Sequence, residues 1–162
     1  MTATTFTSRA VDRDSLLRRA TRVLNQAFTL ANKLAPLGDL GLRLWVADAF
    51  IKSGLTKIQS WDTTIQLFQY EYMVPLLPPE LAAYLGTATE LGMPVFIVLG
   101  LAGRLSAGVL FVFNIIAVVS YPALEPAGLA MHYAWGVVLF ALFTRGPGKW
   151  SLDHLIRRWL ER

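Results

Sequence analysis

Residues 80–101 read ELAAYLGTATELGMPVFIVLGL, and this stretch decides the fold. A helix of this length would cross the hydrocarbon core of a bilayer, which is roughly 30 Å thick, because a helix rises about 1.5 Å per residue. Pro78 and Pro79 precede the stretch, and proline suits the first turn of a helix, where its missing N–H does no harm. Glu80 opens the stretch, and the one charged residue within its apolar part is Glu90. We therefore predict a membrane-spanning helix with one acid near the bilayer midplane.

Apolar stretches of similar length lie on both sides of this one. The stretch before it, DLGLRLWVADAFIKSGLTKI at about residues 39–58, is long enough to cross but unusually polar for a span. In the segment 59–79 four residues recur at helical spacing, which indicates a short helix at the membrane surface or else a packed loop: Trp61, Ile65, Phe68 and Tyr72. Two further spans are predicted at about residues 105–121 and 129–144. The predicted fold class is therefore all-α, an integral membrane four-helix bundle whose four-span domain covers residues 38–145.

Amphipathic segments flank the predicted spans at both ends. In residues 12–35 apolar residues recur at helical spacing on one face and basic residues fill the other, a pattern typical of helices in the membrane interface. The alternative is a solvated tail that becomes helical only when it packs. We predict that residues 1–37 form a cytoplasmic arm, that Pro36-Leu37-Gly38 ends its helix, and that residues 146–162 form a cytoplasmic amphipathic tail.

The composition excludes several function classes. Hydrophobic residues make up 54% of the 162 residues and charged residues 16%, against about 25% charged residues in soluble domains. The chain has no cysteine, which removes disulfides, thiolate metal sites and thiol–disulfide exchange. Its two histidines, His132 and His154, show no metal-ligand spacing, so no metal site is predicted.

The placement of the basic residues predicts the orientation in the membrane. The net charge is +4, and Lys and Arg occur in the N-terminal arm, in the turn at Arg104 and in the C-terminal tail, whereas the two other loops carry none. This placement favours membrane topology over nucleic-acid binding. By the positive-inside rule, both termini and the middle turn lie in the cytoplasm, with the chain in the bacterial cytoplasmic (inner) membrane.

Ionisable residues inside the predicted spans are candidates for a functional site, because burying a charge in a bilayer costs several kcal/mol unless it is paired or solvated. Asp48 and Lys52 are four residues apart and can pair within one helix, while Glu90 could meet Arg43 or Lys52. Either these charges form salt bridges that only fix helix register, or they line a small polar pocket in the outer half of the bundle. The candidate intramembrane polar site comprises Arg43, Asp48, Lys52, Glu90 and His132, and no catalytic residue is assigned.

A proline lies beside this candidate site. Pro94 cannot donate to the carbonyl four residues back, which belongs to Glu90. We therefore predict a helix kink at Pro94. His132 lies near the outer end of its span, where we expect it to bond a loop carbonyl or to face the aqueous side.

Two strings resemble the DoxX family of bacterial membrane proteins: LRLWVADAFIKSGLTKIQSWDTT matches its opening pattern, and ELGMPVFIVLGLAGR its glutamate-to-arginine pattern. The tract WDTTIQLFQYEYMVPLLPPELAAYLGTATEL looks like a proteobacterial subgroup, often encoded beside small proteins linked to metal-stress responses. The resemblance covers about residues 38–145 and implies four helices in the inner membrane. The matching positions are Arg43, Gly54, Lys57, Glu90, Gly92, Gly100 and Arg104.

The resemblance also implies a class of function. Related proteins include subunits of a thiosulfate:quinone oxidoreductase and accessory proteins of redox enzymes, which implies an accessory or quinone-linked subunit in a redox or metal-stress pathway. A quinone is the possible cofactor in this hypothesis. Lys52 and Glu90 would then exchange protons with the quinone or hydrogen-bond its carbonyl oxygen. The alternative is a non-catalytic assembly, cargo-binding or transport factor for an extracytoplasmic partner. The expected partners are the lipid bilayer and either another protein or further copies of the chain.

Overall fold

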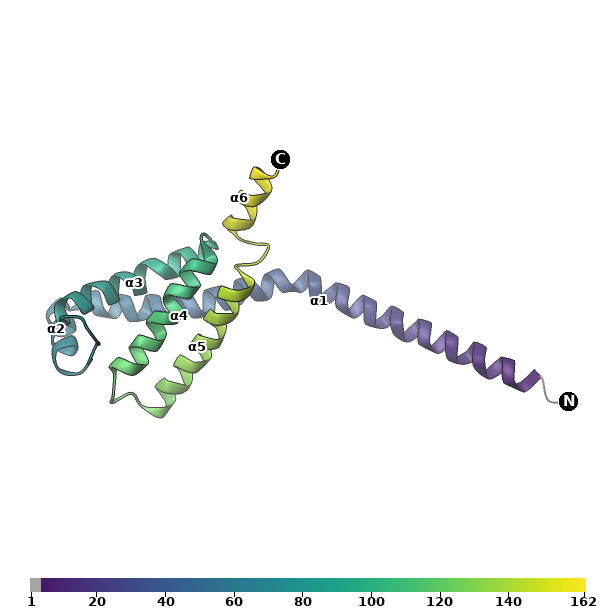
Figure 1. The fold of residues 1–162 in the computed structure, drawn as a ribbon, viewed down its shortest axis with the longest axis horizontal. Helices are drawn as coiled ribbons and strands as arrows, with labels where there is room; N and C mark the ends of the chain where they lie inside the picture. The colour runs from purple at the N-terminus through teal and green to yellow at the C-terminus, as the bar shows by residue number, and fades with distance from the viewer. Residues whose placement is uncertain (1–3) are drawn as a thin grey trace. The chain divides into compact units, whose positions relative to one another are not determined.

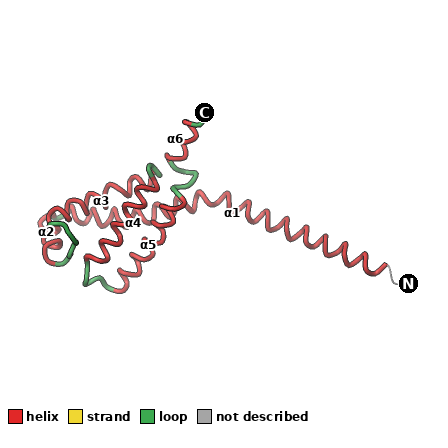
Figure 2. Tube along the Cα trace, in the orientation of Figure 1, coloured by secondary structure: helices red, strands yellow, loops and turns green. Residues whose placement is uncertain are grey.

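The computed structural model describes the backbone of residues 4–162 and the side chains of residues 17–162 (Figure 1). Throughout these residues the regular structure is helical (Figure 2). The chain divides into two units, Met1–Pro36 and Leu37–Arg162. The helices are α1 (Thr4–Gln59), α2 (Trp61–Tyr70), α3 (Pro79–Leu99), α4 (Gly103–Ser120), α5 (Pro126–Arg145) and α6 (Leu152–Leu160).

The first unit is helical, as the spacing in residues 12–35 predicts, and its apolar side chains in residues 17–35 are exposed. Its place at a membrane interface stays a prediction. The predicted helix end at Pro36-Leu37-Gly38 is wrong, because α1 is helical through these residues. Proline removes one backbone hydrogen bond, to the carbonyl of Asn32, and leucine and alanine neighbours favour the helix enough to continue it.

The second unit has a core to which four helices contribute. Val46 and Phe50 of α1 pack with Ile97 of α3, and with residues of α4 and α5. α4 lies against both α3 and α5 (Figure 1). The remaining buried members of this cluster are Ala107, Leu110, Leu139 and Leu142.

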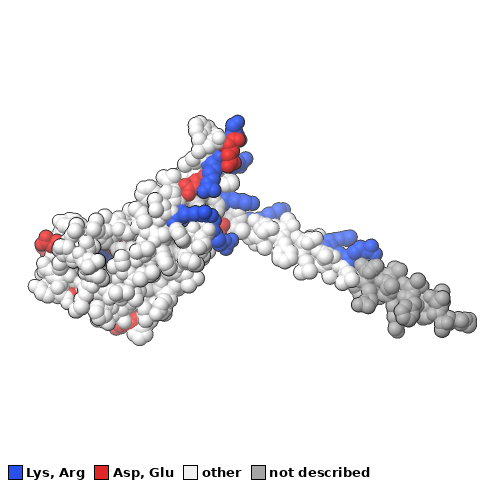
Figure 3. Space-filling model, viewed as in Figure 1, with Lys and Arg blue, Asp and Glu red and all other residues white. Residues whose placement is uncertain are grey.

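In the described part of the chain, three helices are long and apolar enough to cross a membrane, namely α3, α4 and α5. Their outward faces are apolar, and over these helices the face shown in Figure 3 is largely uncharged. A soluble monomer rarely exposes so large an apolar surface, so these helices contact the lipid bilayer. Exposed apolar residues on them include Val95, Val109, Val112, Ile115, Val119, Val137 and Phe140.

The predicted first span, residues 39–58, is the C-terminal part of α1 and falls outside that group. Arg43, Asp48, Lys52 and Lys57 make it more polar than a typical span. Its crossing of the membrane stays a prediction, as does the four-span count.

The segment 59–79 begins with a short helix, as predicted, and ends as a packed connection. Phe68 of α2 is buried with Ala82 and Ala83 of α3. Trp61, Ile65 and Tyr72, which share the predicted helical spacing, pack against this cluster. After α2 the chain is held by Met73, whose N–H donates to the Ser120 carbonyl at 2.7 Å.

The tail forms α6, and its start is explained by the sequence. Ser151 is the residue before the helix, and its side chain accepts a hydrogen bond from the N–H of His154 at 3.2 Å. Such capping satisfies one of the free amides of a first helical turn. The apolar side chains of α6 are exposed and lie at the spacing of one helical face: Leu152, Leu155, Ile156, Trp159 and Leu160.

Candidate functional site

A cavity of about 280 Å³ lies in the second unit among α1, α2, α3, α4, α5 and the connection after α2. We call it the Glu90 cavity. Its wall is mostly apolar, with contributions from Phe68, Leu85, Phe113 and Ala117. Its polar members are Ser53, Lys57, Tyr72, Thr89, Glu90, Ser120, Tyr121 and His132.

An ion pair lies at one side of the Glu90 cavity. The Nζ of Lys57 is 2.7 Å from Oε2 and 2.9 Å from Oε1 of Glu90, and both side chains are largely buried, at 13% and 7% exposed. Ser53 completes the group, because its Oγ accepts from Lys57 at 2.9 Å and donates to Glu90 Oε1 at 3.0 Å. The acid of the second predicted span is thus neutralised in the interior.

Close approach of two helices makes this pairing feasible. A Cβ added to Gly54 would lie 2.7 Å from Leu91 Cδ2 and 3.1 Å from Glu90 Cβ. Glycine at position 54 therefore lets α1 and α3 approach each other beside the ion pair.

The predicted partners of Glu90 were wrong. Lys52 instead pairs with Asp48 at 2.7 Å, the predicted bond within one helix, and both side chains are mostly exposed, at 73% and 59%. The prediction compared only the backbone positions of these residues along their spans. A lysine side chain is long and leans toward the helix N-terminus. Lys57 can therefore reach the carboxylate of Glu90, although the Cα of Glu90 was predicted to lie nearer the bilayer midplane. Two features of the sequence pointed to Lys57: it lies near the end of the predicted first span, and it belongs to the quoted family pattern.

Arg43 is buried away from the Glu90 cavity, so its predicted pairing with Glu90 was also wrong. Its guanidinium donates to the carbonyls of Val98 at 3.0 Å, Ile97 at 3.5 Å and Trp150. It therefore joins α1, the end of α3 and the connection before α6. Gly100 makes room for it, with a left-handed φ of 63° and an added Cβ that would lie 2.7 Å from Arg43 Nη1.

His132 lines the Glu90 cavity, as the hypothesis of an outer polar pocket requires. Its Nδ1 is 2.8 Å from Oδ1 of Asn114, whose Nδ2 donates to the His132 carbonyl at 3.0 Å. Asn114 thus replaces the loop carbonyl that the sequence predicted. Because Asn114 donates through its nitrogen, its oxygen accepts from Nδ1–H, which leaves Nε2 of a neutral imidazole as an acceptor.

Aromatic and hydroxyl groups close another side of the cavity. Tyr72 stacks edge-on against Tyr121, with ring centroids 5.1 Å apart. Burial raises the pKa of the Tyr72 phenol, and Tyr121 and Glu71 raise it further, so Tyr72 stays a protonated donor at neutral pH. Ser120 Oγ is buried and has no hydrogen-bond partner within residues 17–162. Sequence reasoning missed Ser120, for which no pattern gave a signal.

Pro94 is buried within α3, which is helical on both sides of it, and the kink predicted there stays a prediction.

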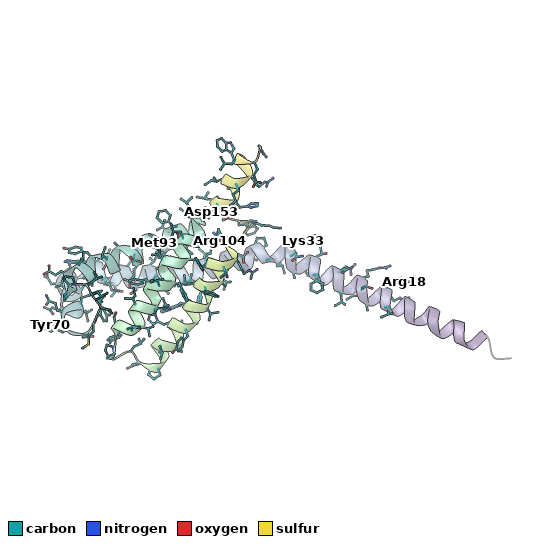
Figure 4. All side chains as sticks on the ribbon, in the orientation of Figure 1. Arg18, Lys33, Tyr70, Met93, Arg104 and Asp153 are labelled. Carbon is teal, nitrogen blue, oxygen red and sulfur yellow. The ribbon has the colours of Figure 1, made fainter. Side chains whose placement is uncertain are left out.

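Among the described residues no group of three His, Asp or Glu side chains is placed to hold a metal ion. Tyr70, labelled in Figure 4, ends α2 and is exposed.

One comparison with known proteins identifies a family. The DoxX family model matches residues 38–123, which is more than half of the chain and includes Arg43, Lys57 and Glu90. The chain is also 31% identical over 124 residues to an uncharacterized protein of Haemophilus influenzae (strain ATCC 51907 / DSM 11121 / KW20 / Rd), with 72% of this chain and 82% of the relative covered. No solved structure matches. Together with the apolar helices α3, α4 and α5, these matches show that the chain is a membrane protein that belongs to the DoxX family.

Proposed function

We propose that the chain crosses the bacterial inner membrane four times, with both termini in the cytoplasm. The C-terminal part of α1 supplies Val46, Ala47 and Phe50 to the core, so it lies among the apolar helices. Its charges are satisfied within the protein, because Lys57 pairs with Glu90 and Lys52 with Asp48. Paired charges can be accommodated in a span. The positive-inside rule supports the orientation.

Single cysteines test this topology, since the native chain has none. Leu76→Cys, at a fully exposed position between α2 and α3, is expected to react with an impermeant maleimide on intact cells. Lys149→Cys, between α5 and α6, is expected to react only after the inner membrane is permeabilised. Equal labelling of both positions in intact cells, or the reverse pattern, would contradict the proposed orientation.

Within this topology we propose that the protein is a quinone-linked accessory subunit whose Glu90 cavity holds a quinone ring. The observation that carries the proposal is an apolar cavity into which a few polar groups converge, an arrangement typical of ligand sites. Its volume of about 280 Å³ lies at the lower limit of such sites, which suits a single ring better than a large ligand.

The polar groups of the cavity fit a ring that carries two carbonyl oxygens. The protonated Tyr72 is a donor, and the orphaned Ser120 hydroxyl would gain a partner and could donate to the second oxygen. Glu90 and His132 Nε2 can hold a proton close to the ring. A bound quinone would supply the electron-accepting chemistry, while these side chains would orient it and move protons. Delivery of electrons falls to a partner in a redox or metal-stress pathway.

The quinone content of the purified protein tests this function. Protein isolated in mild detergent and extracted with organic solvent is expected to yield about one quinone per chain by absorbance and mass spectrometry. Glu90→Gln, and Ala117→Leu, which fills the cavity without touching the ion pair, should each lower this yield about tenfold. Asp48→Asn, an exposed carboxylate outside the cavity, should retain the yield. A quinone-free native protein would overturn the proposal.

An assembly, cargo-binding or transport role is the second candidate. It is favoured by three exposed apolar side chains near the connection from α2 to α3: Tyr70 at 79%, Met73 at 69% and Leu76 at 102%. This surface would bind an extracytoplasmic protein or a second copy of the chain. A quinone-free protein that co-purifies with one specific polypeptide would favour this role over the quinone-linked one.

A further inference from the structure

A second pocket, of about 190 Å³, lies where α4 begins, α5 ends and α6 begins. Three arginine side chains line it: Arg104 from α4, Arg145 from α5 and Arg157 from α6. His154 also lines the pocket, and Asp153 is the one acidic residue in its lining. We call it the arginine pocket. Figure 3 shows mostly blue side chains, with red ones among them, where α5 and α6 meet, and Figure 4 labels Arg104 and Asp153 close together there.

The three arginines of the pocket outnumber its one acid, Asp153, and none of them forms an ion pair with a described residue. In residues 17–162 the ion pairs join Lys52 to Asp48 and Lys57 to Glu90, and neither involves these arginines. Both oxygens of Asp153 accept backbone N–H groups, from Ala102 and from Gly103, each at 2.8 Å. Asp153 therefore serves the N-terminus of α4. Arg104 Nη2 donates to the Arg145 carbonyl at 3.5 Å. The other N–H groups of Arg104 and the guanidinium groups of Arg145 and Arg157 remain available to an external anion.

The wall of the arginine pocket is fixed by the backbone. Gly146 and Gly148 adopt left-handed φ angles of 91° and 81°. The buried Ser151 donates from Oγ to the Gly148 carbonyl at 2.6 Å. An added Cβ on Gly103 would lie 2.7 Å from Pro147, so the start of α4 packs closely on this connection. The arginines thus project from an ordered wall in which three helix ends meet.

We propose that the arginine pocket binds the phosphate head group of an anionic phospholipid. Arg145 ends α5 and Arg104 begins α4, and both helices are long and apolar enough to cross the bilayer. The pocket therefore lies at the level of the lipid head groups on that side of the membrane. Basic pockets between spans bind such head groups, and the guanidinium fork matches phosphate oxygens.

The surroundings favour a lipid over a soluble phosphate. Leu105 and Trp150, next to the pocket in sequence, are 69% and 58% exposed. Apolar residues of α6 are exposed beside Arg157, among them Leu155 and Ile156. Acyl chains could cover these apolar side chains while the head group meets the arginines, whereas inorganic phosphate would leave them uncovered.

Lipid-dependent stability of the full chain in neutral detergent tests the proposal. Phosphatidylglycerol is expected to raise the thermal midpoint more than phosphatidylcholine or inorganic phosphate does. Arg157→Gln should weaken the apparent affinity for phosphatidylglycerol about fivefold, since one basic residue near an anionic surface contributes about 1 kcal/mol. Arg158→Gln removes the same charge from the same helix but outside the pocket, and should change the affinity little.

A second measurement keeps the proposal testable if a variant is less stable. Mass spectrometry of lipids retained during purification should show phosphatidylglycerol depleted from Arg104→Gln/Arg145→Gln and retained by Arg158→Gln. Equal effects of Arg157→Gln and Arg158→Gln would overturn a defined site in favour of diffuse surface charge. An equal midpoint shift with inorganic phosphate would overturn the lipid as occupant in favour of a soluble anion.

Discussion

Replacement of Lys57 by methionine is expected to lower the free energy of unfolding by about 3–5 kcal/mol, because it leaves a buried charge without its partner. Glu90 is 7% exposed, and Lys57 donates to both of its carboxylate oxygens. Ser53 alone would remain to hydrogen-bond the carboxylate. Thermal unfolding of the purified protein in detergent measures the loss.

Lys52→Met is the matched control for this prediction. It makes the same substitution in the same helix, but its pair with Asp48 is mostly exposed, so Asp48 is not left enclosed in the protein interior and the loss should be smaller. The double variant Lys57→Met/Glu90→Gln should recover much of the stability, since both charges are then removed together. Equal losses from Lys57→Met and Lys52→Met would show that the Lys57–Glu90 pair is not buried as described.

Arg43→Met is expected to cost about 3 kcal/mol or more, because it removes hydrogen bonds from a charged donor to three carbonyls. Arg43 is 1% exposed and joins α1 to the end of α3 and to Trp150. Loss of this contact should also loosen the connection that Asp153 attaches to α4. Hydrogen exchange at the Ala102 and Gly103 amides should therefore become faster.

Arg22→Met is the control, since Arg22 is an exposed arginine of the same helix. Its unfolding midpoint and the exchange at Ala102 and Gly103 should stay close to native. If Arg43→Met leaves both readouts unchanged, Arg43 does not connect the ends of these helices. Arg43→Lys should retain only part of the stability that Arg43→Met loses, because one ammonium group cannot reproduce a planar guanidinium that reaches three carbonyls.

The sequence predicted the apolar helices well. Spans expected at about 80–101, 105–121 and 129–144 correspond to α3 (Pro79–Leu99), α4 (Gly103–Ser120) and α5 (Pro126–Arg145). Long apolar runs bounded by proline, glycine and charged residues are the strongest signal that a sequence gives. The helix end expected at Pro36 failed because one lost hydrogen bond is a weaker signal than a long run of helix-favouring residues.

The candidate site was predicted only in part. Glu90 and His132 do line one cavity, whereas Arg43 is held by carbonyls elsewhere, and Asp48 and Lys52 pair on an exposed face. Which helix faces meet depends on packing between segments that are far apart in the sequence. The periodicity of a single sequence does not reveal this packing. The His132–Asn114 pair and the convergence of Lys57 on Glu90 both depend on that packing.

Photoaffinity labelling tests whether a quinone binds in the Glu90 cavity. A photoreactive quinone analogue, bound to the native chain in lipid nanodiscs, can be mapped to its attachment points by peptide mass spectrometry. We expect label on cavity residues such as Tyr72 and Phe113, and this label should be displaced by unlabelled quinone and reduced in Ala117→Leu. Label confined to exposed positions such as Val112 and Val119, undiminished by competing quinone, would contradict it.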